Sequence, residues 1–254
     1  MKKHILSLLM VVLPVLAYAR TKTYFVDGIT YFYHFEKRVT AVAPSLDGVY
    51  RGVIVIPDSV SLDGVTHSVD RIFTSAFFYC DVTSVILPNT LVSIGSEAFA
   101  ESDITSISIP DSVAAIPNMM CKRCESLETV TLGKSVNSLG NEVFGECSSL
   151  KKIISNAVTP PACDSCTFKN YYPQNCVLIV PKGSKASYQN AEGWNLFAQI
   201  FESEEEATDI SATKLDHNAN AEVYGLNGLR LDGQQKGLTI IRKNDGTVRK
   251  VMKR

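Results

Sequence analysis

A repeat of about 22–23 residues constrains the fold of this chain more than any other feature of its sequence. Short apolar runs recur along the chain, and each ends at a proline, glycine or asparagine that begins a turn. These turn residues are Pro57, Pro88, Pro110, Gly133, Asn156 and Pro181. A repeat of this length predicts a solenoid, in which a single coil cannot bury its apolar face and stacked neighbours close a common core.

Each repeat places its apolar residues at fixed distances from the turn residue. Alternate apolar residues just before the turn, such as Val130 and Leu132, predict a short strand with one buried face. A second short strand is predicted after the turn, at positions such as Val113 and Ile116. Further along each repeat stands one residue that we expect to point into the core, and these residues are Phe99, Cys121 and Phe144.

The stretch "ILPNTLVSIGSEAFAESDITSISIPDSV", with "LGNEVFGECSSLKKI" after it, resembles the BspA-like leucine-rich repeat family of bacterial cell-surface proteins. The resemblance covers about residues 24–201 and implies a leucine-rich repeat solenoid, β-rich with short helical turns. "YFVDGITYFYHF" resembles the N-terminal cap of that family, a hairpin with a tight turn at Asp27-Gly28. "VLIVPKGSKASYQNAEGWNLFAQI" resembles its last unit, in which Trp194, Phe197 and Ile200 would cover the final coil from one face of a helix.

The ends of the chain differ from the repeats. A basic start, a short apolar run and the small-x-small motif at 17–19 predict a secretory signal peptide cleaved after Ala19. Glu202 begins an acidic stretch that is poor in apolar residues, which predicts a linker. The expected segments are a signal peptide at 1–19, a cap hairpin at 20–52, the solenoid with its last unit at 53–201, an acidic linker at 202–208 and a small β tail at 209–254.

The β tail has two interpretations. Turn signals at Asn227-Gly228 and at residues 244–246 separate β-like runs, and the segment resembles the C-terminal sorting modules of type IX secretion. Alternatively, it is a small β appendage that packs on the end of the solenoid. With the signal peptide, the resemblance implies an exported protein at the cell surface or outside the cell, associated with the outer membrane.

Composition narrows the class of partner. The formal net charge is −1 at pH 7, and loss of the two lysines in the signal peptide leaves −3. So small a charge predicts no binding of nucleic acid. Outside the signal peptide no segment approaches the ~20 apolar residues of a membrane helix, so no membrane span is expected. The resemblance implies host or microbial surface proteins or glycans as partners.

We expect the binding surface on the outward face of the solenoid sheet, where residues between the buried ones point to solvent. Short polar side chains there offer hydrogen bonds, and the strip becomes basic toward the C-terminal coils. The alternative is that these residues only make the exposed strands soluble. The candidate residues are Thr83, Ser84, Thr105, Ser106, Ser108, Glu128, Thr129, Thr131, Lys151 and Lys152.

The sequence contains no common catalytic motif: no His-Glu-x-x-His pair, nucleophile elbow, dinucleotide-binding turn or Walker loop. His34, His67 and His217 are isolated, and Asp58 and Asp111 fit turn positions. We therefore expect a non-enzymatic, adhesin-like binding module without a cofactor. The alternatives are a hydrolase or metal-dependent enzyme with residues converging from separate coils, and a structural component of the envelope.

Seven cysteines include two Cys-x-x-Cys pairs, at 121–124 and 163–166, which together would supply the four thiolate ligands of a zinc site. The repeat gives another explanation for the first pair, because Cys124 shares its place in the repeat with Cys80 and Cys147, which predicts a ladder of buried packing thiols. Cys163 and Cys166 lie outside that ladder, near Cys176. We expect a local disulfide that involves Cys176 after export.

Overall fold

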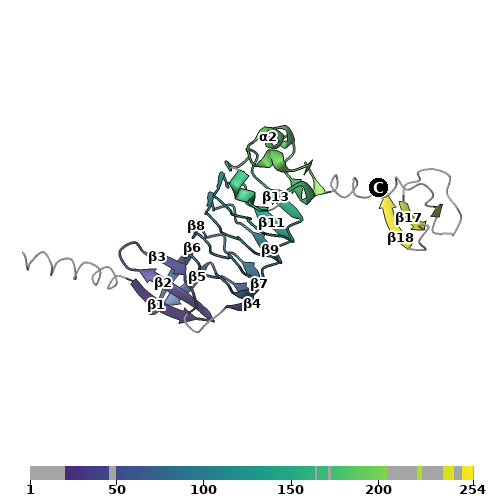
Figure 1. Cartoon of the computed structure of the whole chain (residues 1–254). Coiled ribbons are helices and arrows are strands. Elements are labelled where there is room, and N and C mark those ends of the chain that lie inside the picture. Colours follow the sequence, from purple (N-terminus) through teal and green to yellow (C-terminus); the bar gives the residue numbers. More distant parts are fainter. Residues whose placement is uncertain are drawn as a thin grey trace, which may run out of the picture. The chain divides into compact units, whose positions relative to one another are not determined.

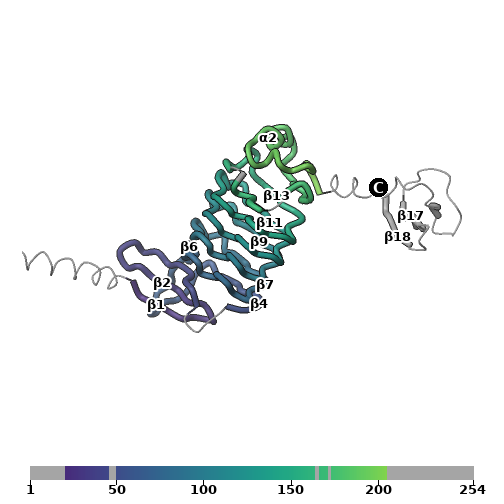
Figure 2. The backbone as a smooth tube through the Cα atoms, in the orientation of Figure 1, coloured from purple at the N-terminus to yellow at the C-terminus, as the bar shows by residue number. Residues whose placement is uncertain are grey.

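The computed structural model describes residues 21–45, 50–163, 165–170, 173–204, 222–224, 237–242 and 248–253. The predicted signal peptide lies outside these residues, as do most of the linker and much of the tail. The chain forms two compact units, 1–203 and 204–254. The first is a solenoid whose successive coils can be followed in Figures 1 and 2.

One side of the solenoid is a sheet of parallel strands, one from each coil. Hydrogen-bonded neighbours run in the order β15-β14-β13-β11-β9, and β4 pairs with β7 before them. The amide of Thr105 donates to the carbonyl oxygen of Thr83 at 3.1 Å, which continues the ladder from β7 to the start of β9. The strands are β4 (Arg51–Val55), β7 (Asp81–Ile86), β9 (Ser106–Ser108), β11 (Thr129–Leu132), β13 (Lys152–Ser155), β14 (Val177–Ile179) and β15 (Gln199–Phe201).

The second predicted strand is present but short: β8 (Ser93–Ile94), β10 (Ala115–Ile116) and β12 (Ser138–Leu139). A turn segment closes each coil and is bonded to the next coil. Phe99 N donates to the Met120 carbonyl oxygen at 2.9 Å, and Cys121 N donates to that of Val143 at 3.0 Å. These turn segments are not helical. The described helices of the solenoid are all in its last coils: η1 (Ser165–Phe168), η2 (Pro173–Asn175), α2 (Lys185–Asn190) and η3 (Trp194–Leu196).

The core consists of the repeating apolar columns predicted from the sequence. Val130 and Leu132 are fully buried, and the rings of Phe77 and Phe99 stack at 5.2 Å between centroids. Each such side chain contributes roughly 1.5–3 kcal/mol through removal from water. Because every coil sends side chains inward at the same places, the core runs through the stack without a break.

The predicted ladder of packing thiols is confirmed. Cys80, Cys124 and Cys147 are buried, and Ser102 occupies the same column. The thiol of Cys124 donates to the Phe99 carbonyl oxygen at 3.0 Å, and that of Cys147 to the Cys121 carbonyl oxygen at 3.0 Å. These small, weakly polar side chains therefore satisfy backbone acceptors inside the core.

The N-terminal cap is larger than the predicted hairpin. β1 (Thr21–Val26) and β2 (Ile29–His34) pair antiparallel around Asp27 and Gly28, whose φ angles of 49° and 79° suit a primed turn. β3 (Val39–Val42) extends this hairpin and pairs parallel with β6 (Val65–Ile72). The extra residues of the first repeat form the hairpin of β6 with β5 (Ser59–Leu62), so they join cap and solenoid in one sheet.

The C-terminal end of the solenoid is closed by aromatic side chains. Trp194, Phe197 and Ile200 are buried there as predicted, but they do not lie on one helix, because Ile200 belongs to β15. The indole of Trp194 donates to the Pro161 carbonyl oxygen at 2.7 Å. The Tyr188 hydroxyl donates to the Ala157 carbonyl oxygen at 2.7 Å, so the polar atoms of both rings are satisfied.

The described residues of the second unit form three antiparallel strands, β16 (Glu222–Tyr224), β17 (Gly237–Arg242) and β18 (Val248–Lys253). The predicted turn signals at 227–228 and 244–246 lie outside the described residues. Among the described residues, no helix has the length and apolar character needed to cross a membrane.

Candidate functional site

The ten predicted residues lie on or beside the strands of the main sheet, and all are exposed or half-buried. Their neighbours along the strands are buried instead, as Ile107 and Val130 illustrate. This alternation arises because successive side chains of a strand point to opposite faces. The residues are Thr83, Ser84, Thr105, Ser106, Ser108, Glu128, Thr129, Thr131, Lys151 and Lys152.

Parallel register brings these side chains into rows across the sheet. Thr129 of β11 lies opposite Ser106 of β9 on one side and Lys152 of β13 on the other. In the next outward row, Thr131 lies opposite Ser108 and Ile154. The middle coils thus present short hydroxyl side chains next to each other, which can hydrogen-bond a partner at little cost in side-chain entropy.

The predicted basic end of the strip carries less uncompensated charge than the sequence suggested. Lys151 Nζ lies 2.6 Å from the Glu128 carboxylate, and both side chains are more than half exposed. Since the pair spans adjacent coils, the charge of Lys151 is balanced on the face itself. A solvent-exposed pair of this kind contributes about 0–1 kcal/mol to folding stability.

The N-terminal end of the same face is apolar, which sequence reasoning missed. Val53, Val55 and Ile86 are 64%, 57% and 55% exposed and stand on β4 and β7. β4 ends in three consecutive apolar residues, Val53, Ile54 and Val55. A continuous apolar run of this kind indicates a strand that is buried on both faces. The outward face therefore changes from apolar through hydroxyl-bearing to charged along the stack.

The turn side of the solenoid carries stacked ion pairs between coils. Arg123 lies between Glu101 and Glu146, with Nε 3.0 Å from the Glu146 carboxylate and Nη1 3.4 Å from that of Glu101. In a second set, Glu142 contacts Lys122 and Lys169 at 2.7 Å each, and these two lysines lower the pKa of the Glu142 carboxyl to about 2. Both sets link neighbouring coils, so we assign them to the stacking of the solenoid.

The residues weighed for catalysis have structural contacts. The Nδ1 atom of His34 accepts a hydrogen bond from Lys37 N at 3.3 Å, and the His67 ring lies 4.2 Å from the ring of Tyr33. Asp111 accepts a hydrogen bond from Lys134 N at 2.8 Å, which lowers the pKa of its carboxyl and confirms it as a turn residue. His217 lies outside the described residues.

The cysteines do not form the predicted disulfide in this structure. Cys176 is fully buried as a thiol, and Cys163 donates to the Glu192 carbonyl oxygen at 3.3 Å. Burial raises the pKa of the Cys147 thiol well above its ordinary value, so that thiol stays protonated. Over the described part of the chain, no group of three or more His, Cys, Asp and Glu side chains is arranged to hold a metal ion.

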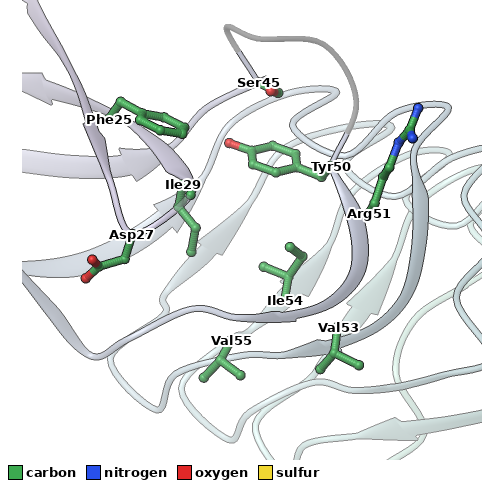
Figure 3. Close-up of a pocket in the computed structure, with 10 residues that line it drawn as sticks. Phe25, Asp27, Ile29, Ser45, Tyr50, Arg51, Val53, Ile54 and Val55 are labelled. Carbon is green, nitrogen blue, oxygen red and sulfur yellow. The ribbon is translucent and has the colours of Figure 1, made fainter.

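A cavity of about 490 Å³ lies between the N-terminal cap and β4 (Figure 3). Its lining combines apolar side chains with two charged side chains and two hydroxyl groups. The lining residues are Phe25, Asp27, Gly28, Ile29, Ser45, Tyr50, Arg51, Val53, Ile54 and Val55. None of these was predicted as a site residue, because the cavity forms where the cap meets the first coil and no repeat position marks that junction.

Residues 61–173 match the family model described as a BspA type leucine rich repeat region, in six copies. No curated protein matches the sequence. The chain therefore contains repeats of the BspA type over its central part, where the structure shows the stacked coils.

Solved structures of bacterial leucine-rich repeat proteins are similar in fold. The leucine-rich repeat protein TpLRR of T. pallidum superposes with a TM-score of 0.51 at 18% identity, over 79% of this chain and 95% of that one. A leucine-rich repeat protein from Bacteroides capillosus gives a TM-score of 0.46 at 21% identity, over 53% of this chain and 99% of that one. The match to the repeat model and the superposition on TpLRR identify the fold as a β-rich leucine-rich repeat solenoid.

Proposed function

We propose that this chain is an exported, non-enzymatic binding protein of the cell surface, adhesin-like, and that it contacts proteins or glycans through the outward face of its main sheet. The observation that carries the proposal is the parallel register of that face. It sets Ser106, Thr129 and Lys152 side by side, with Ser108 and Thr131 in the next row.

The make-up of the face supports binding. Hydroxyl groups dominate its middle coils, exposed valines lie at its N-terminal end, and charged groups lie toward its C-terminal end. A partner that covers the face would bury apolar surface at one end and form hydrogen bonds in the middle. This arrangement of an apolar area beside a polar area is common in protein interfaces.

Two alternative functions are an enzyme and a structural component of the envelope. An enzyme would need reactive side chains that converge from separate coils, whereas the titratable groups described above are engaged in turns and ion pairs. A structural envelope component would have no soluble ligand. Measurement of bound zinc in the purified protein tests the metal-dependent enzyme, and protection of the chain from protease added to intact cells would favour the structural component.

Export and sorting are part of the proposal and have their own test. Surface display is measured for the whole chain and for a chain that lacks residues 208–254, using labelling of intact cells. If the tail is a type IX sorting module, the shortened chain is lost from the surface. Equal display of the two chains would leave the tail as a β appendage without a sorting role.

The binding experiment captures host and microbial surface proteins and glycans with the mature chain, residues 20–254. Glu128, Lys151 and Lys152 are then replaced together by Ala. Removal of Glu128 with Lys151 takes out both members of an ion pair, so no partner is left uncompensated. The proposal expects weaker binding of the captured ligand.

The chain offers a matched control for this variant. Lys134 and Asp111 form an ion pair of similar exposure at 2.9 Å, at the turns that follow the strands. Replacement of both by Ala should leave the affinity unchanged. Unchanged affinity of the variant at Glu128, Lys151 and Lys152 as well would assign binding to another face.

A further inference from the structure

The first strand of the main sheet, β4, has one edge that pairs with no strand in the part of the chain that the structure describes. β4 pairs with β7, and the amide of Ile56 donates to the Ile86 carbonyl oxygen at 3.0 Å. In a parallel ladder, alternate residues direct their N–H and C=O groups to the same neighbour, so Val53 and Val55 direct theirs away from β7. Within the described ranges, no backbone hydrogen bond takes up these outward groups of Val53 and Val55.

A free strand edge is a template for another strand, and proteins usually cover it or protect it with charge. Here the cavity described above runs beside the edge instead (Figure 3). Ile54 points toward Tyr50 and Ile29 across the cavity, whereas the side chains of Val53 and Val55, which also border the cavity, extend from the opposite side of the strand. No described strand thus covers this edge, and apolar side chains such as Ile54 and Ile29 line the space beside it.

The wall of the cavity is held in place by the cap. The Tyr50 hydroxyl accepts a hydrogen bond from Thr30 N at 3.0 Å and donates one to the Ala43 carbonyl oxygen at 2.9 Å. Tyr50 and Ile29 are each 4% exposed, so they have little freedom to move into the cavity. An incoming segment would meet a formed surface, and little energy would be lost in ordering it.

Opposite charges stand at the two sides of this cavity. Figure 3 shows Arg51, at the start of β4, on one side and Asp27, in the turn of the cap hairpin, on the other. Nε of Arg51 lies 3.3 Å from the Asp81 carboxylate, and the side chain is 75% exposed. The guanidinium group has further donors for a second carboxylate.

We propose that the free edge of β4 binds an extended segment of a partner protein as an added parallel strand. The segment carries an acidic side chain beside Arg51, apolar side chains toward Ile54 and Tyr50, and a basic side chain near Asp27. Its main chain bonds the outward groups of Val53 and Val55, as in other cases of strand addition to a sheet edge. Parallel addition continues the direction of every strand in this sheet.

A single extended segment fits this site better than a second copy of the chain. The cap hairpin forms the side of the cavity opposite β4. A partner therefore has to enter as a single extended strand. A second copy would have to bring its own β4 edge, which is walled in the same way. This site uses the main-chain edge of β4 and the cavity beside it, and it does not depend on the function proposed for the outward sheet face, to which the side chains of Val53 and Val55 belong.

The test uses a synthetic peptide with the sequence Asp-Val-Thr-Val-Thr-Lys, labelled at its N-terminus and amidated at its C-terminus, and fluorescence anisotropy with residues 20–254. We expect saturable binding. Val55→Pro removes one outward N–H but leaves the bonds to β7, and it should weaken binding at least tenfold. Val55→Thr keeps that N–H and changes a side chain on the side of the strand opposite Ile54, so it should bind as the unaltered chain does.

A second variant keeps the test decisive if Val55→Pro fails to fold. Arg51→Glu should weaken binding of this peptide about tenfold and favour a peptide whose first residue is Lys. Equal binding by the Val55→Pro and Val55→Thr variants would overturn the proposal, as would no saturable binding of the first peptide or indifference to Arg51→Glu. Light scattering that shows a dimer formed through β4 would also overturn it, in favour of a second copy. Thr131→Arg, on the sheet face, should not change peptide binding, so the two proposed sites can fail separately.

Discussion

Two neighbouring coils fill equivalent places in the core with different pairs of side chains. One coil uses Ala98 and Phe99, the next uses Met120 and Cys121, and all four are fully buried. The large ring of Phe99 follows the small side chain of Ala98. In the next coil the small thiol of Cys121 follows the long side chain of Met120. We infer that Met120 fills the space that a ring at Cys121 would occupy.

Three variants test this exchange of volume. Met120→Ala opens a cavity and should cost about 2–5 kcal/mol of unfolding free energy. Cys121→Phe forces a ring in beside Met120 and should cost about 1–3 kcal/mol. The double variant restores the pair found in the preceding coil, so it should cost at least about 1 kcal/mol less than the sum of the two single losses.

The assay is equilibrium unfolding in urea followed by circular dichroism, with the slope compared among variants to detect any change in the unfolding reaction. Val92→Ala, at a half-exposed valine, is the control and should change stability by less than about 0.5 kcal/mol. If the single losses add within about 0.5 kcal/mol in the double variant, Met120 and Cys121 do not share one space and the reasoning is wrong.

Three further predictions concern single positions. Gly133→Ala should lower stability in urea by about 1–3 kcal/mol, because the new Cβ would lie 2.6 Å from the Pro110 carbonyl oxygen; a loss below about 0.5 kcal/mol would contradict this. The pKa of Glu142 is lowered to about 2, so its stabilising contribution is present above its ordinary pKa of 4.5 and is lost as pH falls toward 2. Glu142→Gln should therefore flatten the fall in melting temperature over that pH range, and an unchanged slope would count against the ion pairs. Tyr188→Phe should cost about 1–3 kcal/mol in urea through the unpaired Ala157 carbonyl oxygen, whereas a neutral result would mean that water replaces the hydroxyl.

The repeated parts of the fold were predictable from the sequence because every coil repeats the same contacts. The column that contains Phe99 and Phe144 shows that Cys121 faces the core, although Cys-x-x-Cys alone suggests a metal site. The same logic placed Cys124 and Cys147 in one buried ladder, and the structure confirms it. Stacking thus allowed the environment of one residue to be inferred from its equivalents.

Features that occur once in the chain were harder to predict. The pairing of β3 with β6 joins the cap to the extra residues of the first repeat, and no repeat pattern records it. The exposed valines of β4 were missed because an all-apolar run indicates burial on both faces, whereas this strand is the first of its sheet. The disulfide expected for Cys176 failed because that thiol packs into the core, which local spacing does not reveal.

The central claim is that the outward face of the main sheet binds the partner. Thr131→Arg places a long charged side chain in the middle of that face, whereas Ala115→Arg adds the same group at an exposed position of β10 on another side of the solenoid. The most direct measurement is the dissociation constant of the captured ligand for both variants by surface plasmon resonance. The account predicts at least tenfold weaker binding for Thr131→Arg and unchanged binding for Ala115→Arg. Equal affinities, or a loss only for Ala115→Arg, would contradict it.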